Sequence, residues 1–189
     1  YDENNNAHFG GEGLVSTMSD FSKFCEMLVS GGIYNNKRII SEESIKTMTS
    51  KYSNGYPDPS EPNVFPLEGY SYGFTFSVLE DSDAWGSGAP DGIYGWSGYH
   101  NTWFWIDPTN KLYGLFMSNS IEPDFSILKD FQIATYKSAT PSLQSRCVSS
   151  PARLVLALWT AQRPRPRERA PRANGRVHAA LAALATTVC

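Results

Sequence analysis

YGWSGYHNTWFWIDP, residues 94–108, carries the clearest structural signal in this chain of 189 residues. Thr102–Ile106 within it is dominated by aromatic side chains, which is typical of a β-strand. The next four residues, DPTN (107–110), have turn chemistry, because Pro presets φ and Asn tolerates the left-handed region. Leu112–Ser118 is a second apolar, strand-like run. These residues therefore predict an antiparallel hairpin.

Upstream, the pattern predicts one more strand and two helices. Between Tyr70 and Val78, aromatic or apolar side chains alternate with small or polar residues, as in a single half-buried strand. A first helix is predicted to begin after an N-cap at Ser19, with Asp20 in its first turn, and to end at Gly31–Gly32. A second, shorter helix is predicted to start at Ser41.

Downstream, Pro123–Asp124 is predicted to open a third helix with Leu128 and Phe131 on one face. Residues 51–69 and 81–92 are rich in Pro, Gly, Ser and Asp and predict two long loops. The order is helix, helix, three strands, helix. We therefore predict an α+β fold, an antiparallel sheet flanked by helices, which is part of a domain.

The composition changes abruptly near residue 140. Residues 1–140 hold 8 basic and 18 acidic residues, a balance of −10, whereas residues 141–189 hold 8 Arg and 1 Glu, a balance of +7, and the sum is the net charge of −3. Of the 25 aromatic residues, 24 lie in the first segment. We therefore expect a folded segment, 1–140, and an Arg/Ala/Pro-rich tail, 141–189, that is disordered or not native to the fold.

The composition argues against several functional classes. No apolar run reaches the ~20 residues of a membrane span. The three Cys and three His show no metal-ligand spacing. The net charge of −3 argues against nucleic acid as a partner, although a basic tail such as residues 141–189 can bind nucleic acid or anionic lipid. We expect no cofactor, and nothing in the sequence indicates a localisation. Tyr1 is neither an initiator Met nor part of a basic leader, so we expect the chain to start inside a longer protein.

Several short motifs occur in a fixed order between residues 9 and 137. GGEGLVST (10–17) precedes the first helix, WSG (96–98) precedes the aromatic strand, and WIDP (105–108) ends it. In this order the sequence resembles the serine β-lactamase-related hydrolases, which include class C β-lactamases, DD-peptidases and lactamase-like esterases. The resemblance implies acyl transfer to a serine, hydrolysis of the acyl-enzyme, and a small-molecule ester, amide or lactam as substrate.

The resemblance also implies roles for residues around the WSG motif. The backbone N–H of Tyr99 would be one oxyanion-hole donor, and Gly98 would allow close approach of the substrate. Ser97 stands where the family has a hydroxyl residue that binds the substrate or a catalytic Tyr. Trp96 replaces the Lys of true β-lactamases, which favours the esterase-like members. We expect Trp96, Ser97 and Gly98, together with His100 and Trp103, to form one wall of the cleft.

The family's Ser-x-x-Lys and Tyr-x-Asn/Ser motifs precede the Gly-rich segment, and this chain begins too late to contain them. Ser126 and Lys129 have the first spacing but follow the WSG motif, so we expect an ordinary helix face there. Tyr34 and Tyr52 each begin a sequence that fits the Tyr-x-Asn/Ser motif, but both follow the Gly-rich segment instead of preceding it. The chain would therefore need a missing N-terminal half and be inactive alone. The alternative is a catalytically inactive binding or structural module.

One stretch of the sequence is close to the motif of a second enzyme class. GWSGY (95–99) is close to the G-x-S-x-G nucleophile elbow, with His100 nearby. The elbow requires Gly where Tyr99 stands and a helix directly after the Ser. The strand-like residues 102–106 argue against it.

Overall fold

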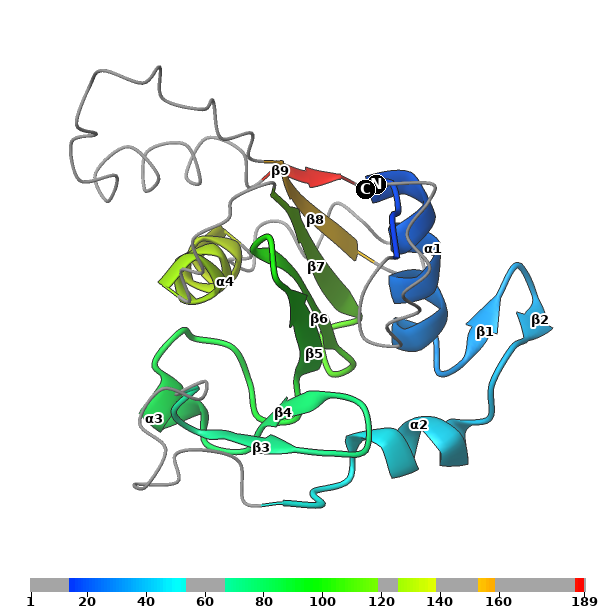
Figure 1. The fold of residues 1–189 in the computed structure, drawn as a ribbon, viewed down its shortest axis with the longest axis horizontal. Helices are drawn as coiled ribbons and strands as arrows, with labels where there is room; N and C mark the ends of the chain where they lie inside the picture. The colour runs from blue at the N-terminus through cyan, green and yellow to red at the C-terminus, as the bar shows by residue number, and fades with distance from the viewer. Residues whose placement is uncertain (1–13, 54–66, 119–125, 139–152, 159–185, 189) are drawn as a thin grey trace, which may run out of the picture.

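The computed structural model describes residues 14–53, 67–118, 126–138, 153–158 and 186–188 (Figure 1). The helices are α1 (Met18–Val29), α2 (Glu42–Thr49), α3 (Ser82–Trp85) and α4 (Ser126–Ser138). The strands are β1 (Ile33–Tyr34), β2 (Lys37–Arg38), β3 (Tyr70–Tyr72), β4 (Ser77–Leu79), β5 (Tyr94–Gly98), β6 (Thr102–Asp107), β7 (Leu112–Met117), β8 (Arg153–Leu158) and β9 (Thr186–Val188).

The main sheet has the order β3-β4-β5-β6-β7-β8-β9, and β1 pairs with β2 as a separate ribbon. The five strands from β3 to β7 are antiparallel. β8 lies parallel to β7, and β9 lies antiparallel to β8. Figure 1 shows α1 and α4 on opposite sides of the sheet, with α3 beside the β3–β4 end. Helices therefore cover both faces of a mostly antiparallel sheet, and the predicted α+β class is confirmed.

The two faces of the sheet carry separate cores, as the alternation of side chains along each strand requires. On β6, Ile106 belongs to the core against α1, whereas its neighbour Trp105 packs against Phe131 of α4 in an edge-to-face contact of 4.7 Å. Opposite Trp105, Gly114 on β7 leaves room for the indole ring, which a Cβ at that position would overlap. The two cores lie on opposite faces of β5 and β6 and stabilise the pairing of these two strands.

The predicted hairpin at residues 102–118 is confirmed. β6 and β7 pair from Trp103 with Phe116 to Asp107 with Leu112. In the turn, Oδ1 of Asp107 accepts the backbone N–H of Asn110 at 2.9 Å. The local turn chemistry therefore fixes this part of the sheet.

The single strand predicted over residues 70–78 is wrong. The chain reverses between β3 and β4, where the N–H of Gly73 donates to the carbonyl of Phe76 at 2.8 Å and that of Phe74 to the carbonyl of Met48 at 3.2 Å. A Cβ at Gly73 would overlap the same carbonyl of Met48. The alternation of side chains continues through a tight turn, so it does not reveal the reversal.

Two other boundaries differ from the sequence prediction. α1 begins earlier than predicted, since its N-cap is Thr17, whose Oγ1 accepts the N–H of Asp20 at 3.1 Å, and not Ser19. α3 lies inside the predicted loop 81–92, capped by Asp81, whose Oδ1 accepts the N–H of Ala84 at 2.9 Å. Short polar residues at neighbouring positions compete for the capping role. The predicted stop at Gly31 and Gly32 is confirmed, since both have positive φ.

The segment after residue 140 contributes the backbone strands β8 and β9 at the edge of the sheet next to β7. Other residues of that segment, and the predicted start of the third helix at 123–125, lie outside the described residues. The division of the chain near residue 140 stays a prediction. Among the described residues, none of the helices has the length and apolar character that crossing a membrane requires.

Candidate functional site

The WSG motif lies at the end of β5, where the chain turns into β6. Gly98 pairs with Thr102, and the N–H of Asn101 donates to the carbonyl of Gly98 at 3.0 Å, which closes a four-residue turn. Asn101 is buried and has a φ of 56°, a conformation that Asn tolerates better than most residues. A Cβ at Gly98 would overlap Oγ1 of Thr102. The turn therefore requires small or tolerant residues at both of its ends.

The structure places the predicted site residues Tyr99 and His100 at the two central positions of this turn and exposes them. Tyr99 is 74% exposed. The centre of its ring lies 5.4 Å from the centre of the His100 ring in an edge contact, and His100 is also exposed. The closing hydrogen bond uses the N–H of Asn101, so the turn itself does not consume the N–H of Tyr99. Tyr99 and His100 thus stand together at the tip of the β5–β6 hairpin.

A cavity of about 390 Å³ opens beside this hairpin, between strands β3 to β6 and α4. Of the predicted site residues, Trp96, Ser97 and Trp103 line it, whereas Gly98, Tyr99 and His100 lie outside its lining. Trp96 is 40% exposed and Trp103 is buried. The lining residues are Ser53, Leu67, Tyr70, Ser71, Tyr72, Ser77, Ile93, Tyr94, Gly95, Trp96, Ser97, Trp103, Phe104, Trp105, Leu128 and Gln132.

Most of the lining residues were not predicted there, and three of these make contacts that shape the cavity. The ring of Tyr72 makes an edge contact with the ring of Trp96, and the two ring centres lie 5.1 Å apart. Gln132 of α4 is fully buried, and its Oε1 accepts the indole N–H of Trp85 at 2.7 Å while its Nε2 donates to the hydroxyl of Tyr70 at 3.3 Å. The tyrosines were predicted only as strand residues. A single Gln on a helix gives no sequence signal of this kind.

The cavity is electrically neutral. Among the described residues that line it, none is Asp, Glu, Lys, Arg or His. Burial raises the pKa of the phenols of Tyr70 and Tyr94 above the ordinary value, so both stay protonated at neutral pH. The cavity can bind and orient part of a small molecule, but its described lining holds no base that would activate a nucleophile.

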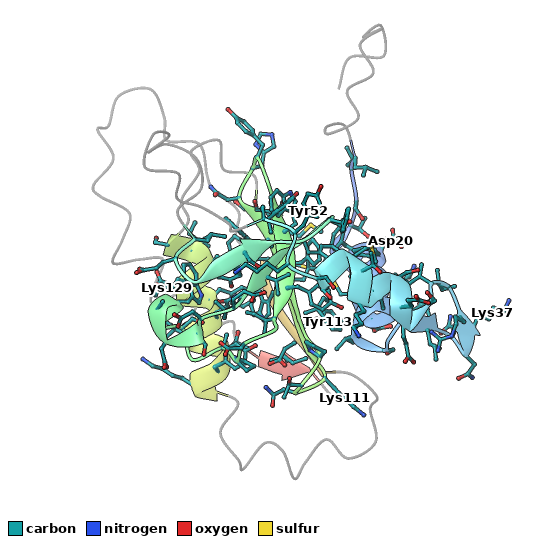
Figure 2. All side chains as sticks on the ribbon, turned by 90° about the horizontal axis from the view of Figure 1, so that it is seen from below. Asp20, Lys37, Tyr52, Lys111, Tyr113 and Lys129 are labelled. Carbon is teal, nitrogen blue, oxygen red and sulfur yellow. The ribbon has the colours of Figure 1, made fainter. Side chains whose placement is uncertain are left out.

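The Ser126 and Lys129 pair lies on α4, as predicted. Ser126 is exposed at the start of the helix, and Nζ of Lys129 lies 5.1 Å from the centre of the Trp85 ring. Figure 2 shows Lys129 at the outer side of the molecule, beside α3. This lysine therefore stabilises the packing of α4 against α3 through a cation–π contact.

The other misplaced motifs also have structural roles. Tyr34 precedes Asn35 and Asn36, whose positive φ values form the turn of the β1–β2 ribbon, far from the sheet, where Figure 2 labels Lys37. Ser53 pairs with Tyr72 through the backbone. The structure agrees with the argument against a nucleophile elbow, because Ser97 lies within a strand that continues through a turn into another strand.

Comparisons with known proteins agree with the motif order. The family model described as Beta-lactamase matches residues 1–137. Two curated proteins are 30% identical to the chain over 122 residues: Uncharacterized protein MT1414 of Mycobacterium tuberculosis strain CDC 1551 / Oshkosh, and Protein Rv1367c of strain ATCC 25618 / H37Rv. Each match covers 62% of this chain and 30% of the relative, so the chain spans about a third of the length of these relatives.

Proposed function

This chain belongs to the beta-lactamase family, and from that membership we propose that it forms the C-terminal part of a serine hydrolase that acts through an acyl-enzyme. A serine hydroxyl would attack the carbonyl carbon of an ester, amide or lactam, and the carbonyl oxygen would take up the negative charge. Collapse of that intermediate breaks the bond to the alcohol oxygen or amide nitrogen, which takes up the proton lost by the serine. The alcohol or amine then departs from an ester or amide, whereas the nitrogen of an opened lactam stays attached to the acyl group, and water finally releases the acid and the serine. The observation that carries the proposal is the family match over residues 1–137.

Tyr99 is the proposed oxyanion donor of this chain. Its backbone N–H follows Gly98 at the exposed end of β5, and the turn is closed by the N–H of Asn101 instead. A backbone donor on a hairpin held by two cores is preorganised, so it costs little reorganisation when charge develops on the oxygen. This is the physical requirement of an oxyanion hole.

The side chains before this donor are proposed to bind the substrate. Ser97 offers a hydroxyl at the edge of the cavity, and Trp96 and Trp103 offer aromatic surface. Trp96 stands where lactamases have a Lys, so a substrate carboxylate finds no cation there. His100 completes the proposed wall at the hairpin tip.

The nucleophile and its base are proposed to lie upstream of this chain in the whole protein. The matched region covers only 30% of the curated relatives. Of the Ser126 and Lys129 pair, Lys129 contacts the ring of Trp85, which holds its ammonium group in the packing of α4 against α3. The domain then requires its N-terminal half for catalysis.

Labelling with a fluorophosphonate probe tests the proposal. In the whole protein we expect the probe on a serine upstream of Tyr1, mapped by mass spectrometry, and a Ser126→Ala variant should be labelled to the same extent. The 189-residue chain by itself should remain unlabelled. A label on Ser126 or Ser97 would refute the assignment of the nucleophile.

The neutral lining of the cavity favours a second candidate function, a catalytically inactive binding module. A cavity with no charged group can hold an apolar molecule without any chemistry. The same experiment separates the two candidates: if the whole protein takes no label at any serine and hydrolyses no ester, the binding module is the better account.

A further inference from the structure

We propose that the cavity between β3–β6 and α4 receives the acyl group of an ester substrate, and that this acyl group is uncharged and apolar. The inference rests on the proposed function for the reacting carbonyl, but its physical basis is the lining of the cavity. A volume of about 390 Å³ is within the range of sites for small organic molecules.

The walls of the cavity are mainly aromatic and aliphatic. Trp96, Trp103 and Trp105 contribute indole surface along β5 and β6, and Leu67 and Leu128 contribute aliphatic surface from the loop and from α4. Aromatic side chains bury large areas of a ligand at little entropic cost. This surface suits a hydrocarbon group.

Several of the polar side chains in the lining are already engaged within the protein. The hydroxyl of Ser71 donates to Oε1 of Glu80 at 3.0 Å, and that of Ser77 donates to the carbonyl of Gly95 at 3.1 Å. Both ends of the Gln132 amide are hydrogen-bonded, one of them to Tyr70. A ligand carboxylate would therefore find no cation in the cavity that replaces its hydration, whereas an uncharged acyl group needs none.

The cavity also lies close to the proposed oxyanion donor along the chain. Ser97 and Trp103 are paired residues that line the cavity, and Tyr99 follows Ser97 by two positions. A strand rises about 3.3 Å per residue, so the separation along the chain is at most about 7 Å. An acyl chain of a few carbon atoms on an ester held at the N–H of Tyr99 is long enough to reach the cavity.

Binding of a brominated ester to the 189-residue chain tests the inference without requiring turnover. Methyl ω-bromooctanoate carries a heavy atom that quenches indole fluorescence on contact, and three Trp side chains line the cavity. We expect saturable quenching by the ester, and at least about tenfold weaker binding of ω-bromooctanoate, its ionised acid, which corresponds to about 1.4 kcal/mol. Equal affinities, or no saturable quenching by the ester, would overturn the inference.

A matched pair of variants locates the bound ester. Ser53 is exposed and lines the cavity, whereas Tyr52 beside it is exposed and does not. Ser53→Phe should narrow the mouth and weaken ester binding at least about fivefold, while Tyr52→Phe should leave it unchanged. Equal affinities for the two variants would place the ester elsewhere and refute the inference. The comparison of ester with acid needs no variant, so it stands even if Ser53→Phe folds poorly.

A substrate series on the whole protein separates this inference from the proposed function. If p-nitrophenyl esters are hydrolysed and octanoate is preferred over acetate and over an acyl group with a terminal carboxylate, both proposals are supported. If esters are hydrolysed with the opposite preference, the cavity assignment fails and the hydrolase proposal stands. If the ester binds as predicted and nothing is hydrolysed, the hydrolase proposal fails alone.

Discussion

The hydroxyl of Tyr136 donates a hydrogen bond of 2.8 Å to Oδ2 of Asp107, which joins α4 to the turn between β6 and β7. Asp107 is fully buried, and the same oxygen also accepts Nδ2 of Asn110 at 2.8 Å. A buried carboxyl group is stable only when its oxygens are hydrogen-bonded. This contact therefore anchors one end of β6, the strand whose other end carries the turn with Tyr99.

Tyr136→Phe removes only the hydroxyl of this contact. We expect the free energy of unfolding to fall by about 1–3 kcal/mol, because Asp107 loses a partner in a buried position. Urea denaturation followed by circular dichroism measures the change. Tyr99→Phe is the matched control, since it removes an exposed hydroxyl and should have no effect. Equal stabilities of the two variants would contradict the anchoring role.

Gly114→Ala tests the contact of Gly114 with Trp105. The added methyl group would overlap the indole ring, so we expect a loss of about 1–3 kcal/mol. In the background Trp105→Leu, where the ring is absent, the same substitution should cost much less. Urea denaturation of the two single variants and the double variant measures this coupling. Additive losses would mean that the ring does not set the requirement for glycine.

Stability should fall at high pH because buried phenols stay protonated in the folded state. Burial raises the pKa of Tyr70, Tyr94, Tyr113 and Tyr136, and the carboxyl group of Asp107 raises that of Tyr136 further. Below the ordinary tyrosine pKa of about 10, folded and unfolded states are equally protonated, and the stability is fully present. Above it, ionisation favours the unfolded chain, so the stability is lost as pH rises towards the raised values.

This pH dependence is measured by urea denaturation at a series of pH values, with tyrosinate absorbance followed in parallel. We expect the free energy of unfolding to decline above about pH 10 and tyrosinate from the buried phenols to appear only with unfolding. The decline should be less steep in Tyr136→Phe than in Tyr99→Phe. A free energy that stays constant through this range would contradict the prediction.

Cys25 should be an unreactive thiol in the folded protein. It is fully buried, and burial raises the pKa of its thiol to about 12, so the reactive thiolate is scarce near neutral pH. In a chain with Cys147→Ser and Cys189→Ser, we expect iodoacetamide to modify Cys25 in concentrated urea and to leave it unmodified in buffer over the same time. Rapid modification in buffer would contradict the packing of α1 against the sheet.

The sequence predicts those parts of the fold whose cause is local. The β6–β7 hairpin follows from the residues at 107–110, because Asp107 and Asn110 build the turn between themselves. The reversal between β3 and β4 is not predictable in this way. It depends on hydrogen bonding of Phe74 to Met48, a residue of a different element.

The candidate site likewise has one part that the sequence predicts and another that depends on contacts between separate elements. The WSG motif and Tyr99 are found from the motif order, because they are contiguous in the chain. The cavity is not, because its walls come from separate elements that meet only in the folded chain, as the hydrogen bonds of Gln132 on α4 with Tyr70 of β3 and Trp85 of α3 show. Such contacts leave no periodic pattern in the sequence, so the neutrality of the cavity is visible only in the structure.

The proline variant of Tyr99 in the whole protein tests the central claim most directly, since proline removes the backbone N–H and alanine keeps it. Tyr99 is the second residue of a four-residue turn, a position that accepts proline, and the residue is 74% exposed, so both variants should fold. We predict that Tyr99→Pro lowers kcat for ester hydrolysis by about 100- to 1000-fold and that Tyr99→Ala changes it little. Equal activity of two folded variants would contradict the assignment of this N–H to the oxyanion hole.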